Sequence, residues 1–291
     1  MKMITSGIFQ QIGIYFRKTV RIAFHERFWK SLIFSGIVAF VIASVIGEKM
    51  FVTFENTQSG FFTISSACIW IGIFNSIQSV CREHEIIHAD CRSGMHISSY
   101  VISAVIWQFI LCFMEAVVIF LLCSVKIDFP TDGLMFAGAA DYFVTVFLLL
   151  FCSSCMGIMV SALSKDENMA MVIMPFVLIF QLIFAGTLFE LGENAQHLSD
   201  ITFSKWGMSA FGSITDLNNR ELYPLKMTVQ MMEDAANNPG AMPPPVIELP
   251  PNETYENTAS TLVSAWGASL LIAFCCTVLS GVILKLRNRD S

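Results

Sequence analysis

The residues that could do chemistry gather in one charged segment, 81–100, which lies between two long apolar runs. Within this segment, His84, Glu85 and His88 satisfy the spacing H-E-x-x-H. On a helix this spacing places both imidazoles on one side, where they could bind zinc while the carboxylate acts as general base toward a metal-bound water. A third ligand is also required, and the nearest acidic and histidine side chains in the sequence fall off that face. A membrane zinc metalloprotease is therefore one hypothesis.

The same segment also fits a helix that contacts a soluble protein. It carries charges of both signs, which could form charge-assisted hydrogen bonds with such a partner. Gly94 would then let the chain turn into the next apolar run, because glycine adopts backbone conformations that other residues avoid. A solvated linker is the remaining alternative for this stretch. The residues that we expect to carry the partner contact are Arg82, Glu83, Glu85, Asp90, Arg92 and Gly94.

The composition indicates an all-α polytopic membrane protein. Of the 291 residues, 55% are hydrophobic and only 14% are charged, whereas a soluble domain has about 25% charged residues. The apolar residues form blocks of about 20 residues or more, the length that a helix needs to cross a bilayer. Acidic residues gather in 190–256, and the rest of the chain has no basic patch that would suggest nucleic acid as a partner.

The apolar blocks predict six transmembrane helices, preceded by an amphipathic helix over 6–28 that lies along the membrane interface. In that first helix, Arg17, Lys18 and Arg21 lie off the apolar face, as in helices that rest on an anionic leaflet. The six predicted spans are 31–47, 56–81, 97–125, 142–164, 168–189 and 257–284.

The distribution of Lys and Arg predicts the orientation of these spans. Basic residues are concentrated in the segment before the first span, in 82–92, at Lys165 and in 285–289. Because short cytoplasmic segments are enriched in Lys and Arg, we expect both termini in the cytoplasm of a cell-membrane protein. The segment 190–256 is then an external loop, and its apolar part, 201–217, predicts a re-entrant or interfacial helix.

Two blocks of sequence resemble the permeases of ABCG-like exporters, the type-2 or White/pleiotropic drug resistance type, in their bacterial branch. The first block has an uncharged span that ends at Glu83, then the charged helix, Ser93-Gly94, and Ser98-Ser99-Tyr100 at the start of the next span. The second has Phe184-Ala185-Gly186-Thr187-Leu188 followed by Ser204-Lys205-Trp206-Gly207. The resemblance implies that 1–291 is a single exporter transmembrane domain, and that 82–94 is a coupling helix pressed against a nucleotide-binding domain.

The resemblance also implies partners. The chain has no G-x-x-x-x-G-K-[ST] loop to hold nucleotide phosphates, so we expect it to bind no cofactor and to have no enzymatic activity of its own. ATP and Mg would be bound by a separate ABC ATPase subunit. A second permease subunit, either a copy or a homologue, and membrane lipid complete the expected assembly. A sensor or scaffold that transports nothing is a further alternative.

The resemblance places a substrate cavity between the second and fifth spans of two permeases, and an outer gate above it. Hydrophobic or amphipathic molecules (lipids, peptides or small molecules) would be moved out of the cytoplasm or inner leaflet through this cavity. Core packing is the alternative role for each of these residues. The cavity residues are Thr63, Ile64, Ala67, Cys68, Ile71, Val172, Phe176, Ile179 and Leu182, and the gate residues are Thr187 and Leu188.

Glu115 interrupts the third predicted span. An ionised carboxylate in a bilayer is costly, so this side chain should face protein or water, or be protonated. We expect it to make a polar contact with a neighbouring helix, and the alternative is a proton or substrate pathway.

Overall fold

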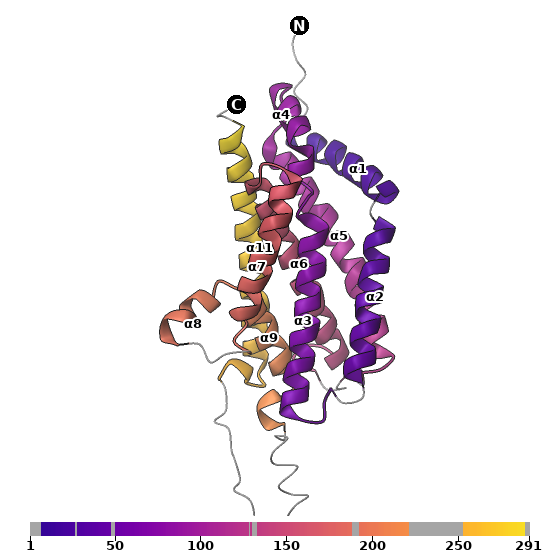
Figure 1. Ribbon diagram of the computed structural model, residues 1–291, viewed down its shortest axis with the longest axis vertical. Helices are drawn as coiled ribbons and strands as arrows, with labels where there is room; N and C mark the ends of the chain where they lie inside the picture. Colours follow the sequence, from indigo (N-terminus) through magenta and orange to yellow (C-terminus); the bar gives the residue numbers. More distant parts are fainter. Residues whose placement is uncertain are drawn as a thin grey trace, which may run out of the picture.

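The computed structural model describes residues 7–26, 28–47, 50–127, 129, 133–187, 192–220 and 253–288. In these residues the protein is an all-helical bundle whose long helices run side by side (Figure 1). The α-helices are α1 (Ile8–Glu26), α2 (Phe28–Ile46), α3 (Phe54–Ser76), α4 (His84–Arg92), α5 (Ile97–Ser124), α6 (Gly138–Leu163), α7 (Glu167–Ile183), α8 (Glu193–Ser199), α9 (Phe203–Ile214) and α11 (Ala259–Arg287). Short 3-10 helices are η2 (Cys81–Glu83), η3 (Leu217–Asn219) and η4 (Glu253–Tyr255).

Five long helices have the length and composition to cross a membrane: α2, α3, α5, α6 and α11. Their mean hydropathy ranges from 1.5 to 2.5, and each has the roughly 20 residues that a span requires. The prediction of an all-α polytopic membrane protein is therefore confirmed.

Two predicted boundaries differ from the structure in an informative way. The span predicted over 56–81 extends past the end of α3, because this helix stops at Ser76 and the chain then passes through turns into η2. The helix predicted over 82–94 is correspondingly divided between η2 and α4. The other long helices lie within a few residues of their predicted ranges.

The fifth predicted span, 168–189, is shorter in the structure. Its helix, α7, has 17 residues and ends at Ile183, so it falls below the length of the five long helices. After Ile183 the chain turns, and Gly186 has a φ of 74°, a left-handed conformation that glycine adopts without the steric cost of a Cβ. Residues 188–191 lie outside the described residues.

The centre of the bundle is the crossing of α3 and α6, where glycines and serines let the two helices pack closely. A Cβ added to Gly72 on α3 would lie 1.9 Å from the Ser153 hydroxyl, and one added to Gly157 on α6 would lie 2.0 Å from the Ser76 hydroxyl. On each helix, therefore, a glycine lies against a serine of the other helix. Small residues let transmembrane helices approach closely, and interhelical hydrogen bonds add to their association.

The helix α9 lies inside one end of the bundle, where it contacts α11, α6 and α3. All of its residues except Lys205 and Trp206 are buried, and Phe211 stacks on Phe61 of α3 with ring centroids 4.7 Å apart. The apolar stretch predicted over 201–217 is thus a helix that packs as an integral part of the bundle.

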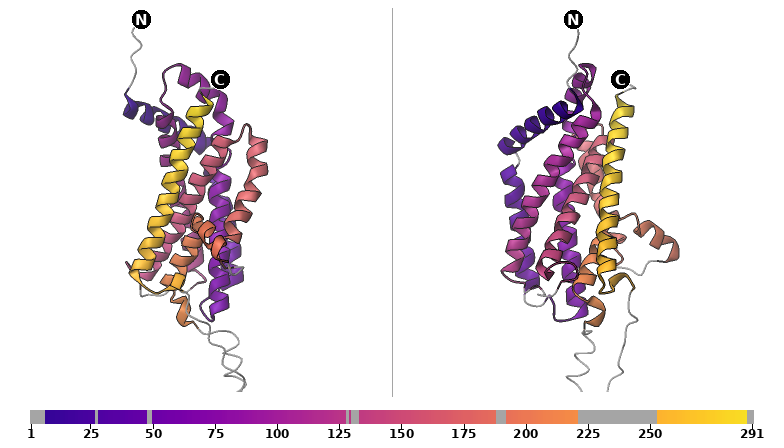
Figure 2. Two further views of the ribbon diagram at one scale, coloured as in Figure 1. Left: turned by 90° about the vertical axis from the view of Figure 1, so that its left-hand side faces the viewer. Right: turned by 180° about the vertical axis from the view of Figure 1, so that it is seen from behind.

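The other end of the bundle carries α1 and α4. Figure 2 shows α1 lying at a steep angle to the long helices, close to the same end as α4 and the C-terminal part of α11. A shared apolar cluster that includes Ile87, Tyr100 and Leu284 joins α4 to α5 and α11. This end presents the charged segment identified in the sequence.

Candidate functional site

The charged segment forms an amphipathic unit, η2 and α4, at the tip of the bundle (Figure 1). Ile87 is 4% exposed and packs into the bundle, whereas Arg82, Glu85 and Arg92 lie on exposed positions. The apolar side of α4 thus fixes it to α5 and α11, and its charged side faces outward. Such a surface can form charge-assisted hydrogen bonds with another protein.

The turn after α4 is fastened to α1 by one glutamine. Gln11 is buried; its amide nitrogen Nε2 donates to the Gly94 carbonyl at 3.2 Å, and its Oε1 accepts from the His96 amide at 2.9 Å. Gly94 has a φ of 100°, which strains any residue with a Cβ. The predicted role of Gly94 in redirecting the chain agrees with this geometry.

Two further side chains of α1 reach residues 81–92, the segment formed by η2 and α4. The Tyr15 hydroxyl donates to Asp90 Oδ2 at 3.0 Å, and Lys18 Nζ lies 3.6 Å from Glu83 Oε2. Burial and the hydrogen bond to Asp90 raise the pKa of Tyr15 well above its ordinary value, so it remains a hydrogen-bond donor. Glu83 and Asp90 therefore each hold a contact with α1 through one carboxylate oxygen, and both side chains remain partly exposed.

These three contacts were not among the sequence expectations, although a signal for them exists. Gln11, Tyr15 and Lys18 are spaced i, i+4 and i+7, which places them along one line of a helix. Polar residues on such a line, next to the apolar face of α1, indicate a second contact surface. The partner of that line is 83 residues away in sequence at Gly94, so only the folded structure reveals it.

Ser161 of α6 supports the start of the same segment. Its Oγ accepts hydrogen bonds from the amides of Val80 and Cys81, both at 3.0 Å, and all three residues are buried. These amides lie where the chain leaves α3 and enters η2, so they have lost the regular hydrogen bonds of α3. The Ser161 hydroxyl thus holds the start of η2 against α6.

The zinc hypothesis is tested by the geometry around its histidines. The rings of His84 and His88 lie 4.5 Å apart, centroid to centroid, on the same side of α4. Among the described residues, however, no group of three His, Cys, Asp or Glu side chains could hold a metal ion. Burial and the nearby positive charge of Arg287 lower the pKa of His84. The histidine pair is present, but a third ligand is not found in the described parts of the chain.

The predicted cavity residues of α3 do not share one exposed face. Ile64, Cys68 and Ile71 are at most 1% exposed, and together with residues of α2 and α5 they line a cavity of about 10 Å³. Thr63 is exposed and Ala67 is half-buried. The exposed side of α3 instead continues from Thr63 to two aromatic residues that the sequence expectations did not include, Trp70 and Phe74.

On α7 the predicted residues do lie on an exposed face. Val172, Phe176 and Ile179 are 64%, 70% and 54% exposed, while Leu182 is half-buried. Because α7 contacts α3, the two helices present neighbouring apolar surfaces. Of the two gate residues, Thr187 is half-buried, and Leu188 lies outside the described residues.

Glu115 lies at a junction of three helices. It is fully buried, and its Oε1 accepts hydrogen bonds from the Ser31 hydroxyl of α2 and from the Asn75 amide of α3, the latter at 2.6 Å. The Ser31 hydroxyl also lies 2.8 Å from Asn75 Oδ1. The side chain thus faces protein, and it connects α2, α3 and α5 through polar contacts.

The long apolar helices and the charged tip define a multi-pass membrane protein. A comparison with known protein families identifies which family it belongs to. The family described as ABC-2 type transporter matches residues 10–214, which is more than half of the chain. The chain therefore belongs to the ABC-2 type transporter family. It is a transmembrane permease of that family, as the resemblance in the sequence implied.

A curated relative gives a second comparison. The chain is 21% identical over 228 residues to the ABC transporter ATP-binding/permease protein Rv1747 of Mycobacterium tuberculosis. The match covers 73% of this chain and 26% of the relative, so the chain spans about a quarter of that protein's length. The relative's name combines an ATP-binding part with a permease.

Proposed function

We propose that the chain is the membrane-spanning subunit of an ATP-driven exporter of the ABCG-like type, bacterial branch, powered by a separate ABC ATPase subunit. ATP and Mg would be bound in that partner. The observation that carries this proposal is the position of α4 in an ABC-2 permease: a charged helix at the tip of the bundle, fixed by Ile87 and by the contacts from α1. Movement of a docked ATPase would reach α3 and α5 directly, because α4 lies between them in the chain.

In this proposal the tip of the bundle and both termini lie in the cytoplasm. The short helix α7 serves as the fifth of six spans, and α9 re-enters the membrane from the outside. A helix of 17 residues is about 26 Å long, so α7 falls slightly short of the roughly 30 Å hydrocarbon core. The buried α9 would complete the outer part of this span, which is consistent with its packing inside the bundle.

The substrate path would lie on the exposed apolar surface of α3 and α7, facing a second permease subunit. Thr63, Trp70, Phe74, Val172 and Phe176 are the strongest candidates to line it, because all five are exposed in the single chain. Such a surface suits hydrophobic or amphipathic substrates. Ile64, Cys68 and Ile71 would act one layer behind it, by packing α3 against α2 and α5.

Purification of the full chain from its native host in mild detergent, with mass spectrometry of what accompanies it, tests this proposal. A soluble protein with a phosphate-binding loop, at a stoichiometric level, supports it. The variant Arg92→Ala should then lower substrate-stimulated ATPase activity, whereas Lys285→Gln, an exposed charge at the end of α11, should not. Unchanged ATPase activity in Arg92→Ala would contradict the role of α4. A preparation without any ATPase would favour the sensor or scaffold.

A further inference from the structure

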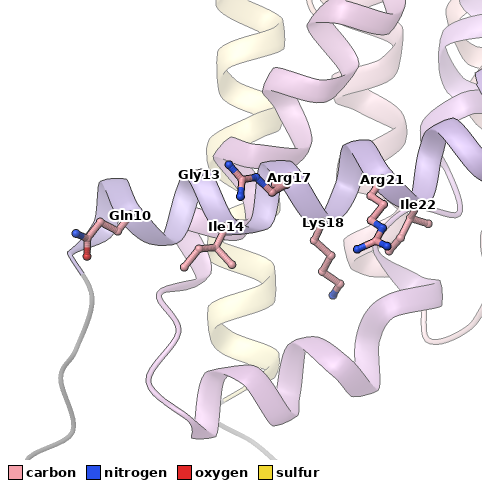
Figure 3. A pocket seen from close by; sticks show the side chains of 7 residues that line it. All are labelled: Gln10, Gly13, Ile14, Arg17, Lys18, Arg21 and Ile22. Atoms are coloured by element: carbon pink, nitrogen blue, oxygen red, sulfur yellow. The ribbon is translucent and has the colours of Figure 1, made fainter.

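A groove of about 740 Å³ runs along α1, and three of its seven lining residues are basic. Figure 3 shows the side chains that line it, all from this one helix. Arg17, Lys18 and Arg21 contribute three positive charges, and no lining residue is acidic. At Gly13 the helix surface is bare, because a Cβ there would meet nothing within 4 Å. The groove is thus a hollow beside Gly13 with a cationic wall.

The chemistry around the hollow is amphipathic as well as basic. Ile14 and Ile22 also line it and are 61% and 40% exposed. On the neighbouring side of α1, Phe9 and Phe24 are 89% and 48% exposed. With 100° between successive residues of a helix, Phe24 lies about 20° around the helix from Arg17 and two turns further along it, so a large apolar side chain shares the face that carries the bases.

We propose that this groove binds the headgroup of an anionic phospholipid from the surrounding leaflet. The phosphate would lie against Arg17 and Arg21, which are one helical turn apart, and the acyl chains would follow the exposed phenylalanines. Arginine suits this role because its planar guanidinium forms paired hydrogen bonds with phosphate oxygens. An amphipathic interfacial helix binds membranes through this combination of apolar contact and attraction to anionic lipids. The inference depends on the chain being a membrane protein, and it does not depend on the proposed ATPase.

Lys18 lies between the proposed lipid site and η2. It lines the groove and also lies 3.6 Å from Glu83, and both side chains are partly exposed. A phosphate in the groove would compete with Glu83 for this ammonium group. The lipid site and the contact between α1 and η2 therefore share one residue.

Native mass spectrometry of the full chain in detergent, titrated with phosphatidylglycerol or phosphatidylcholine of the same acyl chains, tests the proposal. We expect the wild type to retain about one phosphatidylglycerol per chain and to prefer it at least tenfold over phosphatidylcholine. The double variant Arg17→Gln/Arg21→Gln should bind phosphatidylglycerol about 30-fold more weakly, because each base near a membrane surface contributes about 1 kcal/mol. Circular dichroism should show the same helical content, because both residues are exposed.

Two single variants locate the site. Gly13→Leu places a bulky side chain in the hollow beside Arg17 without changing charge and should also weaken binding, whereas Lys285→Gln removes an exposed charge on α11 and should not. Equal retention of the two lipids by the wild type overturns the proposal. So does unchanged binding in the double variant or in Gly13→Leu. If the double variant instead loses a co-purifying acidic protein while lipid binding stays the same, the groove is a protein-binding surface and the proposal is wrong.

Discussion

The hydroxyl of Ser161 is the side chain whose removal we expect to affect the segment formed by η2 and α4 most directly. Ser161→Ala leaves the amides of Val80 and Cys81 without their acceptor in a region where these residues are 1% and 7% exposed. A buried donor left without a partner costs about 1–3 kcal/mol. The two amides together therefore imply a loss of about 2–6 kcal/mol at the junction of α3 and η2.

Hydrogen exchange measured by mass spectrometry on the full chain reports this loss locally. A destabilisation of at least 2 kcal/mol corresponds to about 30-fold faster exchange in peptides that contain residues 78–84. Unfolding by SDS in mixed micelles reports the global part of the effect. Ser161→Thr, which keeps the hydroxyl, should restore much of the protection.

The matched control is Ser154→Ala on the same helix. Ser154 is equally buried, but its hydroxyl donates to the Gly72 carbonyl at 3.1 Å, which also accepts from the Ser76 hydroxyl. Loss of the Ser154 hydroxyl leaves the Gly72 carbonyl paired and removes only a 3.2 Å contact with the Cys112 thiol, a weak hydrogen-bond donor, so it should cost about 1 kcal/mol. If Ser161→Ala and Ser154→Ala differ by less than about 0.5 kcal/mol, and exchange near Val80 is unchanged, the account of the junction is wrong.

Three further predictions concern packing, the α1 contact and pH. Gly72→Ala drives a Cβ into the facing serine and should lower the free energy of unfolding by about 1–3 kcal/mol. The control Gly267→Ala, whose Cβ meets nothing, should raise it by up to about 1 kcal/mol in the same thermal melt, because alanine is the better helix former. Tyr15→Phe removes the hydrogen bond to Asp90 and should cost about 1 kcal/mol, seen as faster exchange in α1; unchanged exchange would count against the contact. Because the pKa of His84 is lowered on folding, stability should fall as the pH drops below about 6.5, and His84→Gln should flatten that dependence.

Hydropathy predicts the long helices well because a helix that crosses a bilayer needs about 20 consecutive, mostly apolar residues. The third span is the clearest case: its predicted range, 97–125, differs from α5 by one residue. The fifth span shows the limit of this reasoning, since apolar residues continue past Ile183 although the helix does not. Gly186 was the available signal for that end, and a hydropathy window averages over a single glycine.

The cavity-lining residues of α3 were less predictable, because the apolar residues of this helix are spread around all of its sides. Without an amphipathic pattern, sequence alone does not say which side of a helix faces its neighbours, and the sides of Ile64 and Trp70 could not be told apart. The structure separates them, because Ile64 is 1% exposed and Trp70 is 45% exposed. The charged residues of η2 and α4 were easier to find, but the contacts of Glu83 and Asp90 with Lys18 and Tyr15 join distant parts of the chain.

The crossing of α3 and α6 also constrains how this sequence can diverge. Gly72 faces Ser153 and Gly157 faces Ser76, so each glycine leaves room for one hydroxyl. A side chain added at either glycine therefore needs a smaller residue opposite. A protein that carries only one of the two substitutions is less stable than the protein before or after both. Substitutions here should be inherited in pairs, such as Gly72→Ser together with Ser153→Gly. A library that randomises both positions and selects for folded protein should recover a small residue on one side whenever the other is enlarged.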